Sequence, residues 1–148
     1  MKRLCYRTSA DNLSGAIPLA VYDISSLKVF IVKENQIQGS LPPNLGFRLS
    51  NLAWLSIAEN QIDGLIPISM SKLKLAIHFG GLSKLTVLSL STNHFRSGEA
   101  DDLSFINTMT NCTNLTTLEL CTNHFGNVLP NSIENLSTQL NWLSDVIL

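Results

Sequence analysis

A leucine pattern that recurs in register constrains this chain more than any other feature. Aligned on four asparagines, the segments read L-x-x-L-x-L-x-x-N, with an apolar residue at every leucine position. Another apolar residue lies two positions after each asparagine. The asparagines are Asn35, Asn60, Asn93 and Asn123. A supersecondary unit repeated in this way predicts a stack of similar coils.

Each x-L-x-L-x stretch alternates, so it predicts a short strand with its leucines inward. The expected strands are 27–33, 52–58, 85–91 and 115–121, paired in parallel between coils. Each asparagine is expected to turn the chain inward and to bond backbone groups that the turn leaves unpaired, which forms a structural ladder. The predicted fold class is α/β: a leucine-rich-repeat solenoid, a right-handed superhelix with a parallel β-sheet on its concave face and short 3-10 or helical segments on its convex face.

A second signature follows the asparagines, as GAIP at 15–18, GSLP at 39–42, GLIP at 64–67 and NVLP at 127–130. Glycine permits a bend, the aliphatic residue is expected to enter the core, and proline ends pairing. A degraded copy with Asp11 at the asparagine position opens the chain, and an incomplete one begins at Leu140. We expect one domain, 1–148, of about five repeats. The long spacing between Asn60 and Asn93 predicts two merged repeats, with distorted geometry at 68–84.

The repeat L-x-x-L-x-L-x-x-N-x-L-x-G-x-I-P resembles the plant-specific leucine-rich repeats of receptor-like kinases and receptor-like proteins, over roughly residues 11–145. SGEADDLSFINTMTNCTNL at 97–115, followed by NSIENLSTQL at 131–140, resembles the receptor-kinase subfamily that includes immune receptors for bacterial peptides. The resemblance implies noncatalytic recognition of a peptide or protein ligand, together with a co-receptor ectodomain. It also implies defence or developmental signalling at the extracellular face of the plasma membrane.

The sequence departs from that family in several ways. Its kinase domain, membrane helix, signal peptide and paired-cysteine caps are not found, so we expect a truncated ectodomain fragment that is not an enzyme. Cys5, Cys112 and Cys121 are odd in number and form no CxxC pair, which predicts unpaired thiols. Two alternatives stay open: a soluble leucine-rich-repeat inhibitor or decoy, and a degenerate truncated product without function.

The composition disfavours nucleic acid as a partner. The chain is 45% hydrophobic and 14% charged, and its net charge is −1. The high apolar content disfavours disorder, and the charge is too low for the basic surface that nucleic-acid binding requires. It contains no apolar run near the roughly 18 residues of a membrane helix, so we expect no membrane insertion by this chain itself. We expect no cofactor and no metal.

Outward strand positions are the expected ligand-binding surface on the concave face. Trp54 stands out, because an outward tryptophan has no core role in this pattern and aromatic anchors are enriched at binding hot spots. The alternative is that Trp54 packs on its neighbours, and that Lys33, Glu34 and Glu59 pair across strands. The predicted contact residues are Val29, Ile31, Lys33, Glu34, Trp54, Ser56, Glu59, Ser89, Ser91 and Glu119.

The sequence contains three other candidate sites. His94 and His124 occupy equivalent positions in two TNHF copies, and with Cys121 they could suggest a hydrolase or a metal site. A strand face rarely supplies the necessary pocket, so we interpret the histidines as solvent-facing variable positions.

The acidic segment 98–102 lacks EF-hand spacing and is interpreted as a solvated loop. N-x-[ST] sequons predict glycosylation at Asn12, Asn111, Asn114 and Asn135.

Overall fold

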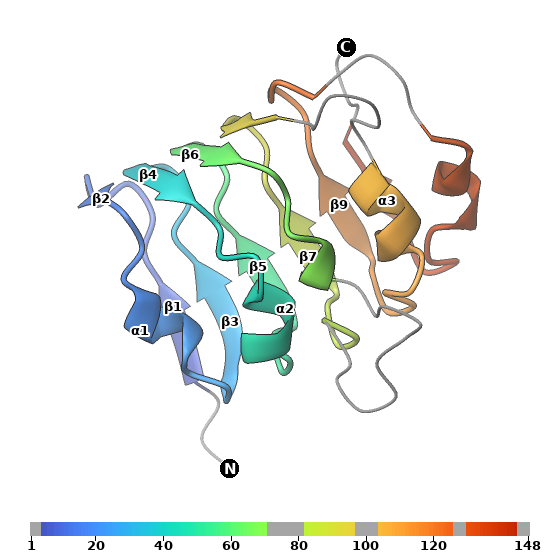
Figure 1. Cartoon of the computed structure of the whole chain (residues 1–148), viewed down its shortest axis with the longest axis horizontal. Coiled ribbons are helices and arrows are strands. Elements are labelled where there is room, and N and C mark those ends of the chain that lie inside the picture. Colours follow the sequence, from blue (N-terminus) through green and yellow to red (C-terminus); the bar gives the residue numbers. More distant parts are fainter. Residues whose placement is uncertain (1–3, 71–81, 97–103, 126–129, 145–148) are drawn as a thin grey trace.

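The leucine-rich segments form the parallel sheet that the repeat predicts (Figure 1). The computed structural model describes residues 4–70, 82–96, 104–125 and 130–144. Its larger sheet has the strand order β1-β3-β5-β7-β9-β10. The strands are β1 Leu4–Arg7, β3 Leu27–Ile31, β5 Trp54–Ser56, β7 Val87–Ser89, β9 Thr117–Glu119 and β10 Trp142–Leu143. The degraded first copy and the incomplete last copy therefore both supply a strand.

The strands are shorter than the expected segments, although bonding between coils continues past their ends. The amide of Val32, just after β3, donates to the carbonyl of Ser56 at 2.9 Å. The amide of Ala53, just before β5, donates to the carbonyl of Lys28 at 2.9 Å. The backbone is no longer extended where the coil turns, so each regular strand ends, but hydrogen bonds between coils continue into the turn.

A second parallel sheet follows the ladder asparagines, and the sequence did not predict it. Its four strands lie in the order β2-β4-β6-β8. They are β2 Ser14–Gly15, β4 Gln36–Ser40, β6 Gln61–Gly64 and β8 His94–Phe95. The signature glycines belong to these strands, where Gly39 and Gly64 take left-handed φ angles of 90° and 84°. The expected bend is thus present, within short paired segments.

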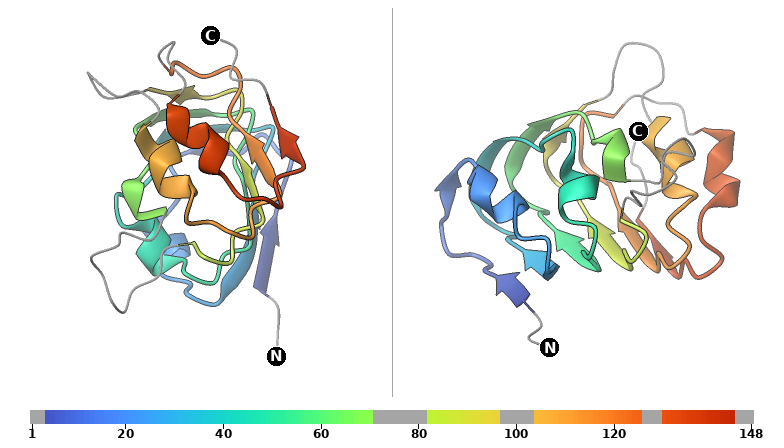
Figure 2. Two further views of the ribbon diagram at one scale, coloured as in Figure 1. Left: turned by 90° about the vertical axis from the view of Figure 1, so that its right-hand side faces the viewer. Right: turned by 60° about the horizontal axis from the view of Figure 1, so that its bottom comes forward.

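Helical segments close each coil on the side away from the larger sheet, as the end-on view in Figure 2 shows. They are α1 Leu19–Tyr22, α2 Leu45–Arg48, η1 Ile68–Met70, α3 Ser104–Met109 and η2 Asn131–Asn135. All are a few residues long. Among the described residues, no helix has the length and apolar character needed to cross a membrane.

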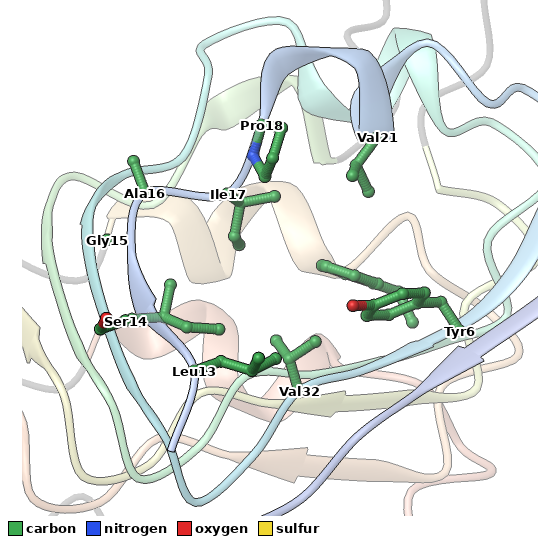
Figure 3. A pocket seen from close by; sticks show the side chains of 11 residues that line it. Tyr6, Leu13, Ser14, Gly15, Ala16, Ile17, Pro18, Val21 and Val32 are labelled. Carbon is green, nitrogen blue, oxygen red and sulfur yellow. The ribbon is translucent and has the colours of Figure 1, made fainter. Parts of the chain in front are cut away.

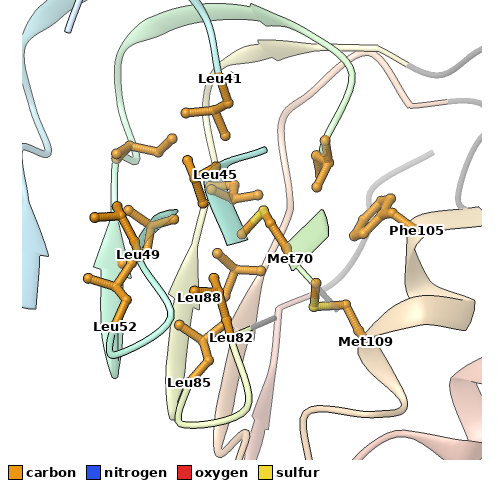
Figure 4. Close-up of a cluster of buried hydrophobic side chains, with 14 of the residues drawn as sticks. Leu41, Leu45, Leu49, Leu52, Met70, Leu82, Leu85, Leu88, Phe105 and Met109 are labelled. Carbon is orange, nitrogen blue, oxygen red and sulfur yellow. The ribbon is translucent and has the colours of Figure 1, made fainter. Parts of the chain in front are cut away.

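One hydrophobic core runs along the inside of the coils (Figure 4). Leu52, Leu55, Leu85 and Leu88 from neighbouring coils are all at most 1% exposed. Met70 and the other buried residues of the helical side meet them from across the coil. Burying a side chain of this size contributes about 1.5–3 kcal/mol, so leucines repeated along the stack are the main source of stability.

The predicted asparagine ladder is confirmed. Asn60 Oδ1 accepts from the amide of Ile37 at 3.0 Å, and its Nδ2 donates to the carbonyls of Val32, Ile57 and Ala58, each at 3.0 Å. One side chain thus bonds its own turn and the preceding coil. The same arrangement recurs at Asn93 and Asn123. Asn35 makes three of these bonds: it accepts from the amide of Leu13 and donates to the carbonyls of Val32 and Lys33.

The residue before each ladder asparagine has an unusual backbone. Glu34, Glu59, Thr92 and Thr122 have φ angles of 58°, 55°, 54° and 55°. This left-handed region disfavours side chains with a β-carbon, and such strain costs of order 1–3 kcal/mol. The turn rotates the following asparagine inward, where its hydrogen bonds offset the strain.

The larger sheet is continuous across the long spacing between Asn60 and Asn93. Strand β5 pairs directly with β7, with Trp54 opposite Val87. Buried Leu82 donates its amide to the carbonyl of buried Met70 at 3.2 Å, so residues on either side of 71–81 meet within one coil. Most of the segment 68–84, for which we expect distorted geometry, lies outside the described residues, at 71–81. The acidic segment 98–102 lies outside them too.

Candidate functional site

The face of the larger sheet that points away from the core, here called the outer face, carries the side chains expected to bind a ligand. Parallel pairing aligns equivalent repeat positions from one strand to the next, so they form rows across the sheet. In the first row lie Cys5, Val29, Trp54, Val87, Thr117 and Trp142. In the second row lie Arg7, Ile31, Ser56, Ser89 and Glu119.

Trp54 is the most prominent predicted residue on the outer face. It lies on the interior strand β5, directly between Val29 on β3 and Val87 on β7. The flanking valines are half-buried, whereas Trp54 remains 42% exposed. The indole therefore has neighbours on both sides and keeps a large apolar surface open to solvent.

Four residues predicted as contacts are almost inaccessible, which corrects the expectation that they face solvent. Ile31, Ser56, Ser89 and Ser91 are 6%, 5%, 5% and 8% exposed. Strands lie about 4.8 Å apart, so a small side chain between longer neighbours is covered. Ser89, for instance, donates its hydroxyl to the carboxylate of Glu119. These four side chains form the floor of the outer face.

Charged residues border this floor. Lys33 and Glu34 form an ion pair, with exposed side-chain fractions of 45% and 38%. The hydrogen bond and the charge of Glu34 raise the pKa of Lys33, and Glu59 and Glu119 act in the same direction. Lys33 therefore stays charged at neutral pH, but its ammonium group is already paired with Glu34. Glu59, which is exposed, and half-buried Glu119 leave the border acidic.

Sequence reasoning missed Trp142, a second exposed tryptophan in the first row. It is 60% exposed on β10 and lies opposite Thr117 of β9. Its signal was present, because Trp142 precedes Leu143 as Trp54 precedes Leu55. The incomplete repeat around it hid that equivalence.

An apolar cavity of about 260 Å³ opens at the first coil (Figure 3). Tyr6, Leu13, Ile17, Val21 and Phe30 are among its lining residues. The rings of Tyr6 and Phe30 lie 5.7 Å apart. Leu13, Ile17 and Val21 also pack against the main core, so the cavity is an open end of that core. No charged side chain lines it.

The histidines lie on the turn that follows the larger sheet. His94 and His124 are both exposed, and their ring centroids are 5.4 Å apart. The two rings therefore lie side by side on adjacent coils. Cys121 donates its thiol to Ser91 Oγ at 3.2 Å, which directs it along the outer face. A pairing of Cys121 with His124 for nucleophilic catalysis would require the thiol to leave this bond.

The cysteines differ in burial, and we expect them to differ in reactivity. Cys5 is exposed, whereas Cys112 is buried, and burial raises the Cys112 pKa to about 11 because the thiolate is disfavoured in apolar surroundings. Only about one part in a thousand would then be thiolate at pH 8. Maleimide labelling of the folded chain at this pH should modify Cys5 quickly and Cys112 only after unfolding. Labelling of Cys112 at the rate of Cys5 would contradict its burial.

The sequon asparagines lie off the outer face. Asn12, Asn114 and Asn135 are exposed, and Asn111 is half-buried. Asn114 Nδ2 donates to the carbonyl of Ser83 at 3.0 Å, which gives that side chain a structural role as well. Glycosylation at these four positions stays a prediction.

Comparison with known proteins points to one class. The family described as "Leucine Rich Repeat" matches residues 114–136. The receptor kinase-like protein Xa21 of rice, Oryza sativa subsp. japonica, is 42% identical over 66 residues. That match covers 45% of this chain and 6% of Xa21. The chain is therefore a small part of the length of this relative.

Solved structures extend the likeness to most of the chain. The ectodomain of the membrane receptor kinase GASSHO1/SCHENGEN3 from Arabidopsis thaliana, in complex with CASPARIAN STRIP INTEGRITY FACTOR 2, superposes with a TM-score of 0.76 at 25% identity. The match covers 93% of this chain and 15% of that one. The Arabidopsis receptor kinase HAESA, in complex with the peptide hormone IDA and the co-receptor SERK1, gives a TM-score of 0.71 at 26% identity over 93% of this chain and 21% of that one.

Fold, ladder and comparisons agree on a leucine-rich-repeat solenoid. Its repeats are similar to those of plant receptor-kinase ectodomains in sequence and in structure.

Proposed function

We propose that this chain is a noncatalytic recognition segment of a plant receptor-kinase ectodomain, and that it binds a peptide or protein ligand on its outer face. The observation that carries the proposal is Trp54. It is 42% exposed on an interior strand where the repeat assigns it no place in the core. Rigid aromatic side chains of this kind are enriched among the residues that dominate binding energy.

The surroundings of Trp54 support a peptide-sized contact. The first row continues through Val29 and Val87, and the acidic border of Glu59 and Glu119 lies beyond it. An apolar strip with a polar border is the usual anatomy of a protein-recognition surface. Two of the similar ectodomains were solved with CASPARIAN STRIP INTEGRITY FACTOR 2 and with the peptide hormone IDA, the second also with the co-receptor SERK1.

The same proposal places the chain outside the cell, with a co-receptor ectodomain as a further partner and with defence or developmental signalling as its context. Glycans on exposed Asn12, Asn114 and Asn135 fit this placement, because they leave the outer face uncovered. Any kinase activity would belong to a segment other than these repeats.

Replacing Trp54 by alanine tests the proposal. A short peptide selected from a random phage-displayed library against the chain serves as the probe, and its Kd is measured by titration. Truncating a hot-spot aromatic costs about 2 kcal/mol, so Trp54→Ala should weaken binding roughly thirtyfold. Lys33→Ala, at the charged border, should have a smaller effect.

The matched control is the double variant His94→Ala with His124→Ala, which alters exposed side chains off the outer face. It should bind the peptide as the unmodified chain does. Circular dichroism would confirm that every variant is folded. Unchanged affinity for Trp54→Ala across independently selected peptides would move the site away from the outer face.

A further inference from the structure

The two TNHF histidines form a pair that the proposed ligand face does not use. His94 lies on β8 and His124 on the equivalent turn of the next coil, with ring centroids 5.4 Å apart and planes inclined by 32°. Together with Thr92 and Thr122 they line a shallow cavity of about 290 Å³. Two imidazoles are thus presented side by side at an accessible surface.

The ladder holds both histidines in place from beneath. Each directly follows a ladder asparagine. Between them, Phe95 donates its amide to Asn123 Oδ1 at 3.1 Å and accepts at its carbonyl from the amide of His124 at 2.8 Å. The Phe95 side chain is fully buried. The backbones that carry the two rings therefore cannot move apart without breaking the coil.

We propose that His94 and His124 form a two-histidine site for a divalent late transition-metal ion, with water completing the coordination. Imidazole nitrogen suits copper, nickel and zinc. Metal–nitrogen bonds are about 2.0–2.1 Å long, so two nitrogens on one ion lie about 3 Å apart. The ring centroids are 5.4 Å apart, and the nitrogens lie on the ring edges, so two facing nitrogens can be closer to each other than the centroids are.

The groups around the two histidines determine how tightly the site would bind a metal ion. Among the described residues, no cluster of three or more histidine, cysteine, aspartate or glutamate side chains could hold a metal ion, so this part of the chain supplies two ligands. Asp63 is the strand partner of His94, and Arg96 is paired with His124 in an isolated backbone β-bridge. Exposed side chains of opposite charge therefore flank the pair. The site is therefore open and of moderate affinity, and Cu²⁺ should bind more tightly than Ni²⁺ or Zn²⁺.

Copper titration of the whole chain tests the site, with Cu²⁺ alone as the probe in a non-coordinating buffer. A second ligand on the same scaffold acts at high effective concentration, so losing either one should weaken binding about tenfold or more. We expect this loss for His94→Ala and equally for His124→Ala. The matched control is His78→Ala, which removes the remaining histidine and should leave the affinity unchanged. Both site residues are exposed, so these variants should fold.

Two further readouts identify the ligands. Electron paramagnetic resonance of the bound Cu²⁺ should report two imidazole nitrogens in the unmodified chain and one in each single variant. Binding should weaken as the pH is lowered, because protons compete with the metal ion for the imidazole nitrogens. Full affinity in either single variant, or loss of binding in His78→Ala, would overturn the proposal. Peptide binding is measured separately, so either proposal can fail without the other.

Discussion

Replacing Asn60 by alanine is expected to destabilise the chain by roughly 4 kcal/mol, counted as four hydrogen bonds at about 1 kcal/mol each. The free energy of unfolding of a domain is only about 5–15 kcal/mol, so this loss would remove a large part of it. The amide of buried Ile37 would lose the acceptor that Asn60 provides. Urea unfolding followed by circular dichroism measures the change. The control is Gln61→Ala at the next, exposed position, which should shift stability little.

Asn60 also bonds two neighbouring coils, so its loss should destabilise one side of the stack more than the other. It bonds Val32 and Ile37 of the preceding coil as well as Ile57 and Ala58 of its own. Stability in a stack is a sum of units and interfaces, so weakening one interface should release the coils before it. Hydrogen exchange in Asn60→Ala should accelerate most in β1 to β4. Asn35→Ala should cost less, because that side chain is half-buried and water can replace its bonds. Equal stability of Asn60→Ala and Gln61→Ala would mean that the ladder contributes little.

Sequence periodicity predicted the parts of this fold that repeat in register. Leu55 and Leu88 recur at fixed offsets from their asparagines, and one rule covers both strand placement and inward direction. The ladder followed from the same alignment. These features depend only on the residue pattern within one repeat, and that pattern recurs often enough to be recognised in the sequence.

Features that depend on neighbouring coils were not predictable in the same way. The second sheet uses strands as short as Ser14–Gly15, too short for any alternation to show. The left-handed turn at Thr92 and Thr122 is carried by branched residues that normally avoid it, so no glycine marks it.

The candidate site shows the same limit. Alternation correctly placed Ser56 and Ser89 outward on the strands, but their burial depends on the side chains of adjacent strands. Trp142 had the right offset and was missed because its repeat lacks the asparagine that anchored the alignment. The spacing of the TNHF copies identified His94 and His124 as equivalent, whereas the distance between their rings comes only from the stacking of coils.

Gly46→Ala should be among the most damaging single changes, with a loss of about 3 kcal/mol or more from overpacking. Gly46 is buried in α2, and its amide donates to Ser69 Oγ at 3.1 Å. A β-carbon at Gly46 would lie 1.8 Å from the carbonyl oxygen of Ser69 and 2.8 Å from Met70 Cα. These are backbone atoms of η1 in the next coil, so relief requires moving one coil against another.

Two control variants separate this clash from other effects of losing a glycine. Gly15→Ala meets open space but has a φ of +81°, so it carries conformational strain alone, about 1 kcal/mol. Phe47→Ala changes the neighbouring, partly exposed position of α2 without adding volume. Thermal unfolding should give a drop of about 10 °C for Gly46→Ala, well beyond both controls. A melting temperature for Gly46→Ala equal to that of Gly15→Ala would show that neighbouring coils can separate at little cost. The helical side would then not hold the spacing between coils, and the asparagine ladder and the two sheets would have to set it alone.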